Sequence, residues 1–143
     1  MRIGELAKAA NCPVETIRYY EQQGIIPAPY RTENNYRFYS QNHLVRLKFI
    51  RNCRSLDMTL EEIRELLKLI VDTPQENCSA ISVLLDEHIK HVKTRIIELQ
   101  ELQNILTDIR KHCVTSSSID HCGIVQQLSD MNMTSQGHKT HLG

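Results

Sequence analysis

The fold is decided by residues 14–39, VETIRYYEQQGIIPAPYRTENNYRFY. Val14, Ile17 and Tyr20 recur at the spacing of a helix face, and Gly24 follows where a glycine commonly ends a helix. The alternation in YRFY comes after two prolines and an Asn-Asn pair, and it predicts a short β-hairpin rather than another helix. We therefore expect a helix followed by a small two-stranded wing.

A second helix is predicted before this stretch. Ile3, Leu6 and Ala7 share one helix face that ends near Asn11, and Pro13 stands where the first turn of the next helix tolerates proline. Two short helices joined by a tight turn predict a helix-turn-helix.

Two further helices are predicted after the hairpin. Ser40 is the expected N-cap of a helix that runs to about Ser55. The sequence TLEE, from Thr59 to Glu62, has the form of a capping box and predicts a fourth helix to about Val71.

Residues 79–112 contain neither glycine nor proline and predict one long helix. Its aliphatic residues recur at steps of three and four, as in a coiled coil. They are Leu85, Ile89, Val92, Ile96, Leu99, Leu102, Leu106 and Ile109, with Ile105 beside the row. No other segment is long enough to cover this face, so we expect it to pair with the same helix of a second, antiparallel copy.

Charge divides the chain although the net charge is zero. Residues 1–56 carry nine Lys/Arg and four Asp/Glu, a net of +5, and residues 57–143 carry eight and thirteen, a net of −5. A basic segment of short helices is typical of a nucleic-acid-binding module, although a solvated surface would carry the same charges. No apolar run approaches the roughly 18 residues of a membrane span, so we expect a soluble cytoplasmic protein without a membrane partner.

The candidate DNA contacts lie on the second helix, on the hairpin and at the end of the third helix. Hydroxyl and guanidinium groups suit phosphate oxygens and the acceptor edge of guanine. The alternative is packing for the tyrosines and simple solvation for the arginines. The candidates are Glu15, Thr16, Arg18, Tyr19, Tyr20, Arg31, Asn35, Tyr36, Arg37 and Arg54.

Three of the five cysteines bracket the long helix, and none of the five forms a C-x-x-C pair. About 35 helical residues separate Cys78 from Cys113, which places them roughly 50 Å apart in one chain, too far to share an ion. In an antiparallel dimer, Cys78 of one copy would instead meet Cys113 and Cys122 of the other. Three thiolates suit cadmium, lead or mercury, whereas zinc usually takes four tetrahedral ligands. Cys12 and Cys53 are expected to be buried as small apolar residues.

The histidines suggest a second, harder metal site. His88 and His91 are one helical turn apart and could supply nitrogen ligands together with Glu62 or with His138 and His141 of the tail. More often, such histidines are solvated or lie at the edge of a core.

These patterns predict a mainly α-helical protein in which an N-terminal winged helix-turn-helix precedes a long antiparallel coiled-coil dimerisation helix and a C-terminal metal-binding loop. The expected boundaries are 1–71 for the DNA-binding domain, 72–78 for a linker loop, 79–112 for the dimerisation helix, 113–130 for the metal-binding loop with a short helix, and 131–143 for a disordered tail.

The motif TIRYYE at residues 16–21, then Gly24, Arg31 and NYRFY at residues 35–39, resembles the winged-helix signature of the MerR family of transcription regulators. The resemblance runs from Ile3 to about Leu69, and the long helix fits it as well. DMTLEEIR at residues 57–64 and DEHI at 86–89, behind Cys78, resemble the cadmium- and lead-responsive branch typified by CadR and PbrR.

The resemblance implies a homodimer on a palindromic promoter with an overlong spacer. Binding of Cd(II) or Pb(II) would then distort this DNA so that RNA polymerase transcribes metal resistance or efflux genes. It also implies metal ligands at Cys78, Cys113 and Cys122. The spacing between Cys113 and Cys122 is also similar to that in mercury sensors, so Hg(II) and Zn(II) remain alternatives for the bound ion.

A thiol redox sensor that forms a disulfide between subunits is the alternative from another class. A metal-storage or chaperone protein would leave the basic helix-turn-helix without a reason. No Ser/His/Asp or Cys/His constellation and no Gly-rich phosphate loop occurs in the sequence, so an enzyme is not expected.

Overall fold

The structure is a computed structural model and describes residues 1–76, 78–113 and 118–132. The chain divides into two compact units, Met1–Ile89 and Lys90–Gly143. The expected domain boundary at residue 71 falls inside the first unit, which also takes in the linker and the beginning of the long helix. Most of the expected tail, with His138 and His141, lies outside the described residues.

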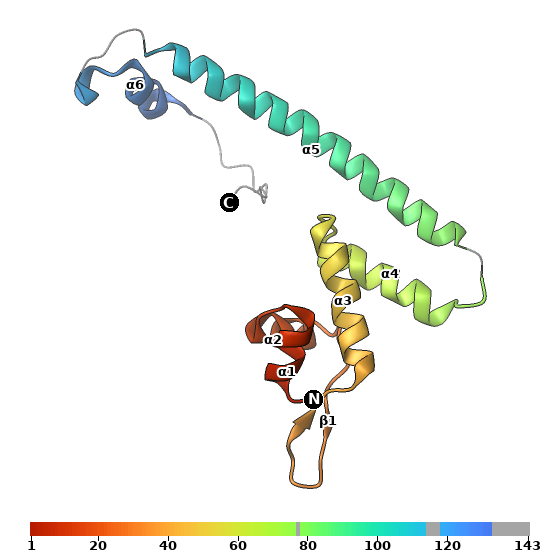
Figure 1. Cartoon of the computed structure of the whole chain (residues 1–143). Coiled ribbons are helices and arrows are strands. Elements are labelled where there is room, and N and C mark those ends of the chain that lie inside the picture. The colour runs from red at the N-terminus through yellow and green to blue at the C-terminus, as the bar shows by residue number, and fades with distance from the viewer. Residues whose placement is uncertain (77, 114–117, 133–143) are drawn as a thin grey trace. The chain divides into compact units, whose positions relative to one another are not determined.

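The first unit contains two short helices, a hairpin and two longer helices in chain order (Figure 1). The two strands are antiparallel, with Tyr30 opposite Phe38 and Arg31 opposite Arg37. The predicted helix-turn-helix, hairpin and following helices are confirmed. The elements are α1 (Ile3–Ala10), α2 (Val14–Gln22), β1 (Tyr30–Arg31), β2 (Arg37–Phe38), α3 (Gln41–Ser55) and α4 (Leu60–Asp72).

Local signals in the sequence set these boundaries. Asn11 ends α1 in the left-handed region, and Gly24 takes a φ of 73° after α2, which glycine adopts without a steric penalty. Pro13 is the N-cap of α2. It therefore lies just before the first turn of the helix, in which the sequence placed it. The Thr59 hydroxyl accepts a hydrogen bond from the Glu62 N–H at 3.1 Å, and the Glu62 carboxylate accepts one from the Thr59 N–H at 3.0 Å. The capping box of α4 is therefore confirmed.

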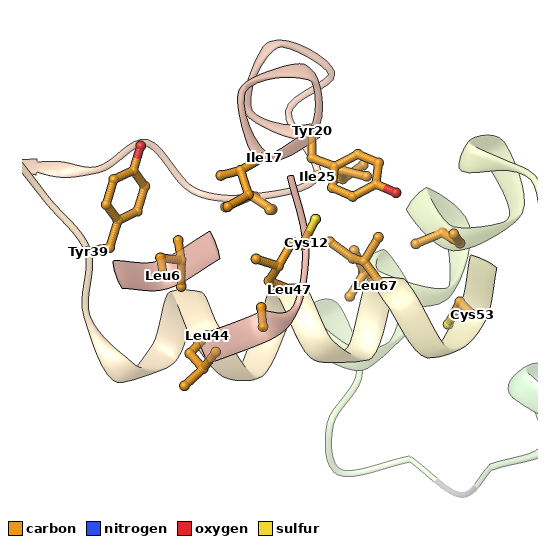
Figure 2. Packing of buried hydrophobic residues seen from close by; sticks show 14 of the residues in the cluster. Leu6, Cys12, Ile17, Tyr20, Ile25, Tyr39, Leu44, Leu47, Cys53 and Leu67 are labelled. Atoms are coloured by element: carbon orange, nitrogen blue, oxygen red, sulfur yellow. The ribbon is translucent and has the colours of Figure 1, made fainter. Parts of the chain in front are cut away.

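One apolar core joins α1, α2, α3 and α4. Leu6, Ile17 and Leu47 come from three different helices and are fully buried in one cluster (Figure 2). Cys12 and Cys53 are each 6% exposed and belong to the same cluster, as the sequence predicted. Each buried aliphatic side chain contributes about 1.5–3 kcal/mol, so the core holds α1 against both α2 and α3.

Helix α5 (Ser79–Lys111) is the predicted long helix and ends one residue earlier than expected. In the first unit, Ile81 and Leu84 of α5 pack against the core. In the second unit most of the apolar stripe is open to solvent: Ile96 is 50% exposed and Leu106 is 57% exposed. Ile109, at the end of the row, is buried.

The second unit continues beyond α5 into two short elements. These are a 3-10 turn, η1 (Ile119–His121), and the helix α6 (Gly123–Asp130), which corresponds to the short helix expected after Cys122. Among the helices that the structure describes, none combines the length and the apolar character of a membrane span.

Candidate functional site

Helix α2 presents a polar face to solvent. Glu15, Arg18 and Tyr19 are exposed on it, and Thr16 is half-buried. Ile17 lies on the opposite side, in the core. A carboxylate, a guanidinium and two hydroxyls are therefore offered by one short helix, which is the type of surface that reads base edges and phosphates.

Tyr20 differs from the other candidates on α2 because its ring packs inward. It is 7% exposed and belongs to the core cluster, since its position three residues after Ile17 places it on the apolar face. Burial raises the pKa of the Tyr20 hydroxyl, against the effect of the nearby Arg54, which shares a hydrogen bond with it. The structure thus favours the packing alternative for Tyr20 over a surface contact.

Arg54 is exposed at the end of α3, with part of its hydrogen-bonding capacity already used. Its Nη1 donates to the Met58 carbonyl oxygen at 2.8 Å, besides the contact with Tyr20. The nearby Arg51 donates to the Ala10 carbonyl oxygen at 3.1 Å. Both arginines therefore stabilise the unit, and the exposed Arg54 also adds positive charge to its surface.

The wing carries exposed basic and polar side chains on a turn with defined hydrogen bonds. Arg31 and Arg37 are cross-strand neighbours, and both are exposed. Arg31 Nη1 donates to Asn35 Oδ1 at 3.1 Å, and Asn35 has a positive φ of 66° at the tip. Tyr36 is 62% exposed, and the guanidinium of Arg2 lies 5.7 Å from its ring centre. The predicted wing contacts therefore share one solvent-facing hairpin.

Two buried polar residues attach the wing to the helices. The Tyr39 hydroxyl donates a hydrogen bond to the Glu21 carboxylate, and burial together with this bond raises the pKa of Tyr39 to about 12. His43, which is 2% exposed, accepts from the Ser40 N–H through Nδ1 at 3.0 Å. Its Nε2 then donates to the Ala28 carbonyl oxygen at 3.2 Å.

No role was predicted for His43 from the sequence, although the sequence contains a signal for one. In a capping box the third residue of the helix is usually Glu or Gln, and His43 occupies this position after Ser40. The ring also packs edge-on against Tyr30 of the wing, with ring centres 5.6 Å apart. His43 thus links the start of α3 to the wing.

The five cysteines fall into two groups by environment. Cys12 and Cys53 are buried, and burial raises the pKa of each thiol. Cys78 and Cys113 are exposed, and Cys122 is half-buried. Only the second group is accessible to an ion from solvent, which agrees with the division that the sequence predicted.

Cys122 is held at the N-cap of α6. The nearby backbone N–H groups of Val125 and Ile124 lower the pKa of its thiol, and the neighbouring Cys113 and the charge of Arg110 lower it further. A thiolate at a helix N-terminus is stabilised by such amides. The second unit therefore brings Cys113 and Cys122 together, whereas Cys78 belongs to the first unit, where its carbonyl oxygen accepts from the Ser82 N–H at 2.9 Å at the start of α5.

Gly123 is a second residue for which no role was predicted from the sequence. A Cβ atom added there would overlap the His112 carbonyl oxygen and lie 3.2 Å from both the carbonyl carbon and the Cβ of His112. The start of α6 therefore touches the backbone just before Cys113. A glycine directly after a candidate ligand, at the start of a helix that it disfavours, is the signal in the sequence.

A group of nitrogen and oxygen ligands lies near the beginning of α5. His88 Nδ1 is 2.9 Å from a carboxylate oxygen of Glu62, and His88 Nε2 is 2.8 Å from the Leu56 carbonyl oxygen. Ligand atoms of Glu62, His88 and His91 all lie within 4.8 Å of one another. Burial would raise the pKa of Glu62, but hydrogen bonds from Thr59 and the charge of His88 outweigh it and lower this pKa. Part of the predicted second site is thus assembled.

Known proteins resemble this chain over most of its length. The family model described as MerR HTH family regulatory protein matches residues 1–70, and that described as MerR, DNA binding matches residues 44–109. The chain is 48% identical over 130 residues to the HTH-type transcriptional regulator ZntR homolog of Haemophilus influenzae, which covers 87% of this chain and 96% of that protein. It is 41% identical over 128 residues to ZntR of Escherichia coli K12, which covers 89% of this chain and 91% of that protein.

A solved structure is similar as well. It is the crystal structure of the transcription regulator PbrR691 from Ralstonia metallidurans CH34 in complex with lead(II), with a TM-score of 0.76 and 48% identity over 90% of this chain and 98% of that chain. These relatives are transcription regulators and not enzymes. The chain therefore belongs to the MerR family of helix-turn-helix regulatory proteins.

Proposed function

We propose that this chain is a metal-responsive transcription regulator that activates metal resistance or efflux genes from a palindromic promoter. The observation that carries the proposal is the juxtaposition of two free thiols, Cys113 and Cys122, in a chain that begins with a winged helix-turn-helix. Such thiols stay reduced in the cytoplasm, where we place the protein.

The donor set fits a soft divalent cation. Cys122 is stabilised as a thiolate by backbone amides, and Cys113 and Cys78 are exposed to solvent. Three thiolates favour Cd(II) or Pb(II), with Hg(II) and Zn(II) as competitors. The lead(II) complex of PbrR691, at 48% identity, supports this choice. When bound, the cation would supply a positive centre that joins the three sulfurs.

The three thiols are proposed to meet only in a homodimer. Cys78 precedes and Cys113 follows α5, which at 33 residues and about 1.5 Å per residue is roughly 50 Å long. The exposed stripe of α5 is a suitable face for an antiparallel partner. Cys78 of one protomer would then stand beside Cys113 and Cys122 of its partner.

Regulation is proposed to act through the shape of the promoter. The DNA-reading surface would consist of the exposed residues of α2, the wing and Arg54, with Tyr20 behind them. Joining the beginning of one α5 to the end of the other would reorient the two DNA-binding domains as a pair. Bending and untwisting an overlong spacer costs a few kcal/mol and would bring the promoter elements into register for RNA polymerase.

A second, auxiliary ion site is proposed at Glu62, His88 and His91. Two imidazoles and a carboxylate form a harder donor set than the thiols, and their ligand atoms are already close together. The tail residues His138 and His141 would complete it. The ratio of metal to protein, measured by native mass spectrometry, should fall for a chain ending at Met131, and an unchanged ratio would refute the role of the tail.

An in vitro transcription assay tests the main proposal. Cd(II) or Pb(II) should activate transcription by the wild-type protein in the presence of a reductant. The variants Cys78→Ser, Cys113→Ser and Cys122→Ser should lose this activation and keep operator binding. Cys53→Ser is the matched control and should respond as the wild type does.

The same assay separates the alternatives. Activation by an oxidant, with no response to metal under reducing conditions, would favour a thiol redox sensor and refute the metal proposal. A titration series with Cd(II), Pb(II), Hg(II) and Zn(II), followed by thiolate-to-metal charge-transfer absorption, orders the ions. Tight Cd(II) or Pb(II) binding by a monomeric variant would refute the shared site.

A further inference from the structure

The contact between Gly123 and His112 is a steric requirement and not a conformational one. Gly123 has no positive φ, so its backbone conformation is open to any residue. A Cβ atom at this position would instead collide with the backbone carbonyl of His112, which cannot rotate away as a side chain could. Only the absence of a side chain allows α6 to begin directly against the end of α5.

This contact lies between the two thiols of the second unit. His112 immediately precedes Cys113, and Gly123 immediately follows Cys122. The same approach brings Cys113 near Cys122. Any residue larger than glycine would move the start of α6 by roughly an ångström, which is enough to spoil a ligand geometry.

We propose that Gly123 is a positioning residue. Because it has no side chain, α6 can begin close enough to the end of α5 for the Cys113 and Cys122 sulfurs to bind one ion together. The inference deepens the proposed function and rests on it for the identity of the ion. Its steric basis does not depend on metal, because it concerns the distance between two thiols of one chain.

Helix propensity predicts the opposite effect of a substitution and so provides a sharp test. Alanine favours a helix over glycine by about 1 kcal/mol, so a purely structural role predicts that Gly123→Ala leaves α6 unchanged or more stable. The positioning role predicts an intact α6 with a separated thiol pair. Gly4→Ala in α1 is the matched control, because a Cβ at Gly4 meets no atom within 4 Å.

The probe is phenylarsine oxide, a trivalent arsenical that condenses with two neighbouring thiols. Two As–S bonds form, and the oxygen leaves as water with the two thiol protons. Full-length protein carrying Cys78→Ser keeps Cys113 and Cys122 as the accessible pair. In this background Gly123→Ala should lower the affinity for phenylarsine oxide at least tenfold, and Gly123→Val should lower it further, while Gly4→Ala should have no effect.

Hydrogen exchange of the α6 amides and operator binding complete the experiment. Unchanged α6 protection with weakened arsenical binding supports the positioning role. Undiminished arsenical binding by Gly123→Ala would overturn it, and so would loss of α6 protection, because the weaker binding would then follow from the loss of the helix. If the wild type binds the arsenical through both thiols but Cd(II) and Pb(II) fail to activate transcription, the proposed function fails and the inference about Gly123 stands.

Discussion

The first unit completes its hydrophobic core within one chain, whereas the second unit leaves an apolar surface open. Leu6, Ile17 and Leu47 are fully buried by residues of their own unit. Ile96 and Leu106, on the same kind of amphipathic helix, remain half exposed. The first unit therefore buries its core with its own residues, while the long helix keeps an exposed apolar face of the kind that packs against another helix.

The cysteines of the two units also differ in burial and in the pKa of their thiols. Cys12 and Cys53 lie in the completed core, where desolvation raises the pKa of the thiols. Cys122 lies at the accessible start of α6, where backbone amides lower the pKa of its thiol. The same side chain is an inert packing element in one unit and a reactive ligand candidate in the other, because burial and hydrogen bonding differ.

A charged substitution in the exposed stripe of α5 should produce the largest effect, which is on the stability of the dimer. Leu106→Asp places a charge in the stripe of both protomers, each of which loses roughly 2 kcal/mol of apolar burial. The dimer dissociation constant should therefore rise about 1000-fold, as measured by sedimentation equilibrium. Thr94→Asp, on the opposite side of α5, is the control. A dimer of Leu106→Asp as tight as the wild type would show that the stripe is not the interface.

A truncation in the core of the first unit should have a somewhat smaller effect. It should lower the free energy of unfolding by an amount that does not depend on protein concentration. Leu47→Ala removes a fully buried side chain and should lower the free energy of unfolding of the first unit by about 3 kcal/mol. Urea denaturation at two protein concentrations measures it. Val45→Ala, at a position 60% exposed on the same helix, should change stability by less than about 0.5 kcal/mol. Equal effects of the two substitutions would contradict the assigned core.

Alkylation kinetics can measure how far the accessible and the buried thiols differ in reactivity. At neutral pH, Cys122 should react with iodoacetamide at least about a hundredfold faster than Cys53, because its pKa is lowered and it is accessible. Peptide mapping by mass spectrometry gives the two rates. The rate at Cys122 should also level off below the pH at which an ordinary thiol does. Comparable rates for the two thiols would remove the chemical distinction between the units.

The smallest effect at neutral pH is expected at the attachment of the wing. Tyr39→Phe removes the hydrogen bond to Glu21 and should cost about 1 kcal/mol of unfolding free energy. Because the folded state raises the pKa of Tyr39 from 10.0 to about 12, its contribution is present below pH 10 and is lost as pH rises toward 12. Urea denaturation across this range should show a steeper decline for the wild type than for Tyr39→Phe. Parallel curves would contradict the buried hydroxyl.

The sequence was sufficient for the order and type of the elements. Helical spacing, the glycine at residue 24 and the TLEE capping box depend on neighbours within a few residues, so they can be read without the fold. The same holds for the unpartnered stripe of α5 and for the assignment of Cys12 and Cys53 to the core.

The sequence could not distinguish a surface tyrosine from a core tyrosine. Tyr19 and Tyr20 are adjacent and chemically identical, but one is 46% exposed and the other 7% exposed. The rotation of α2 against α1 and the rest of the core decides between them. This rotation results from packing among residues distant in sequence, such as Leu6 and Leu47.

The sequence alone determined the helix-turn-helix, the wing, the long helix and which cysteines stay out of the core, because these follow from local periodicity and polarity. Only the tertiary structure decided that His43 attaches the wing, that Glu62 lies against His88, and that Gly123 lets Cys122 approach Cys113. Each of these depends on the distance between segments separated along the chain. Such distances are set by the summed packing of the whole unit and leave no periodic pattern in the sequence.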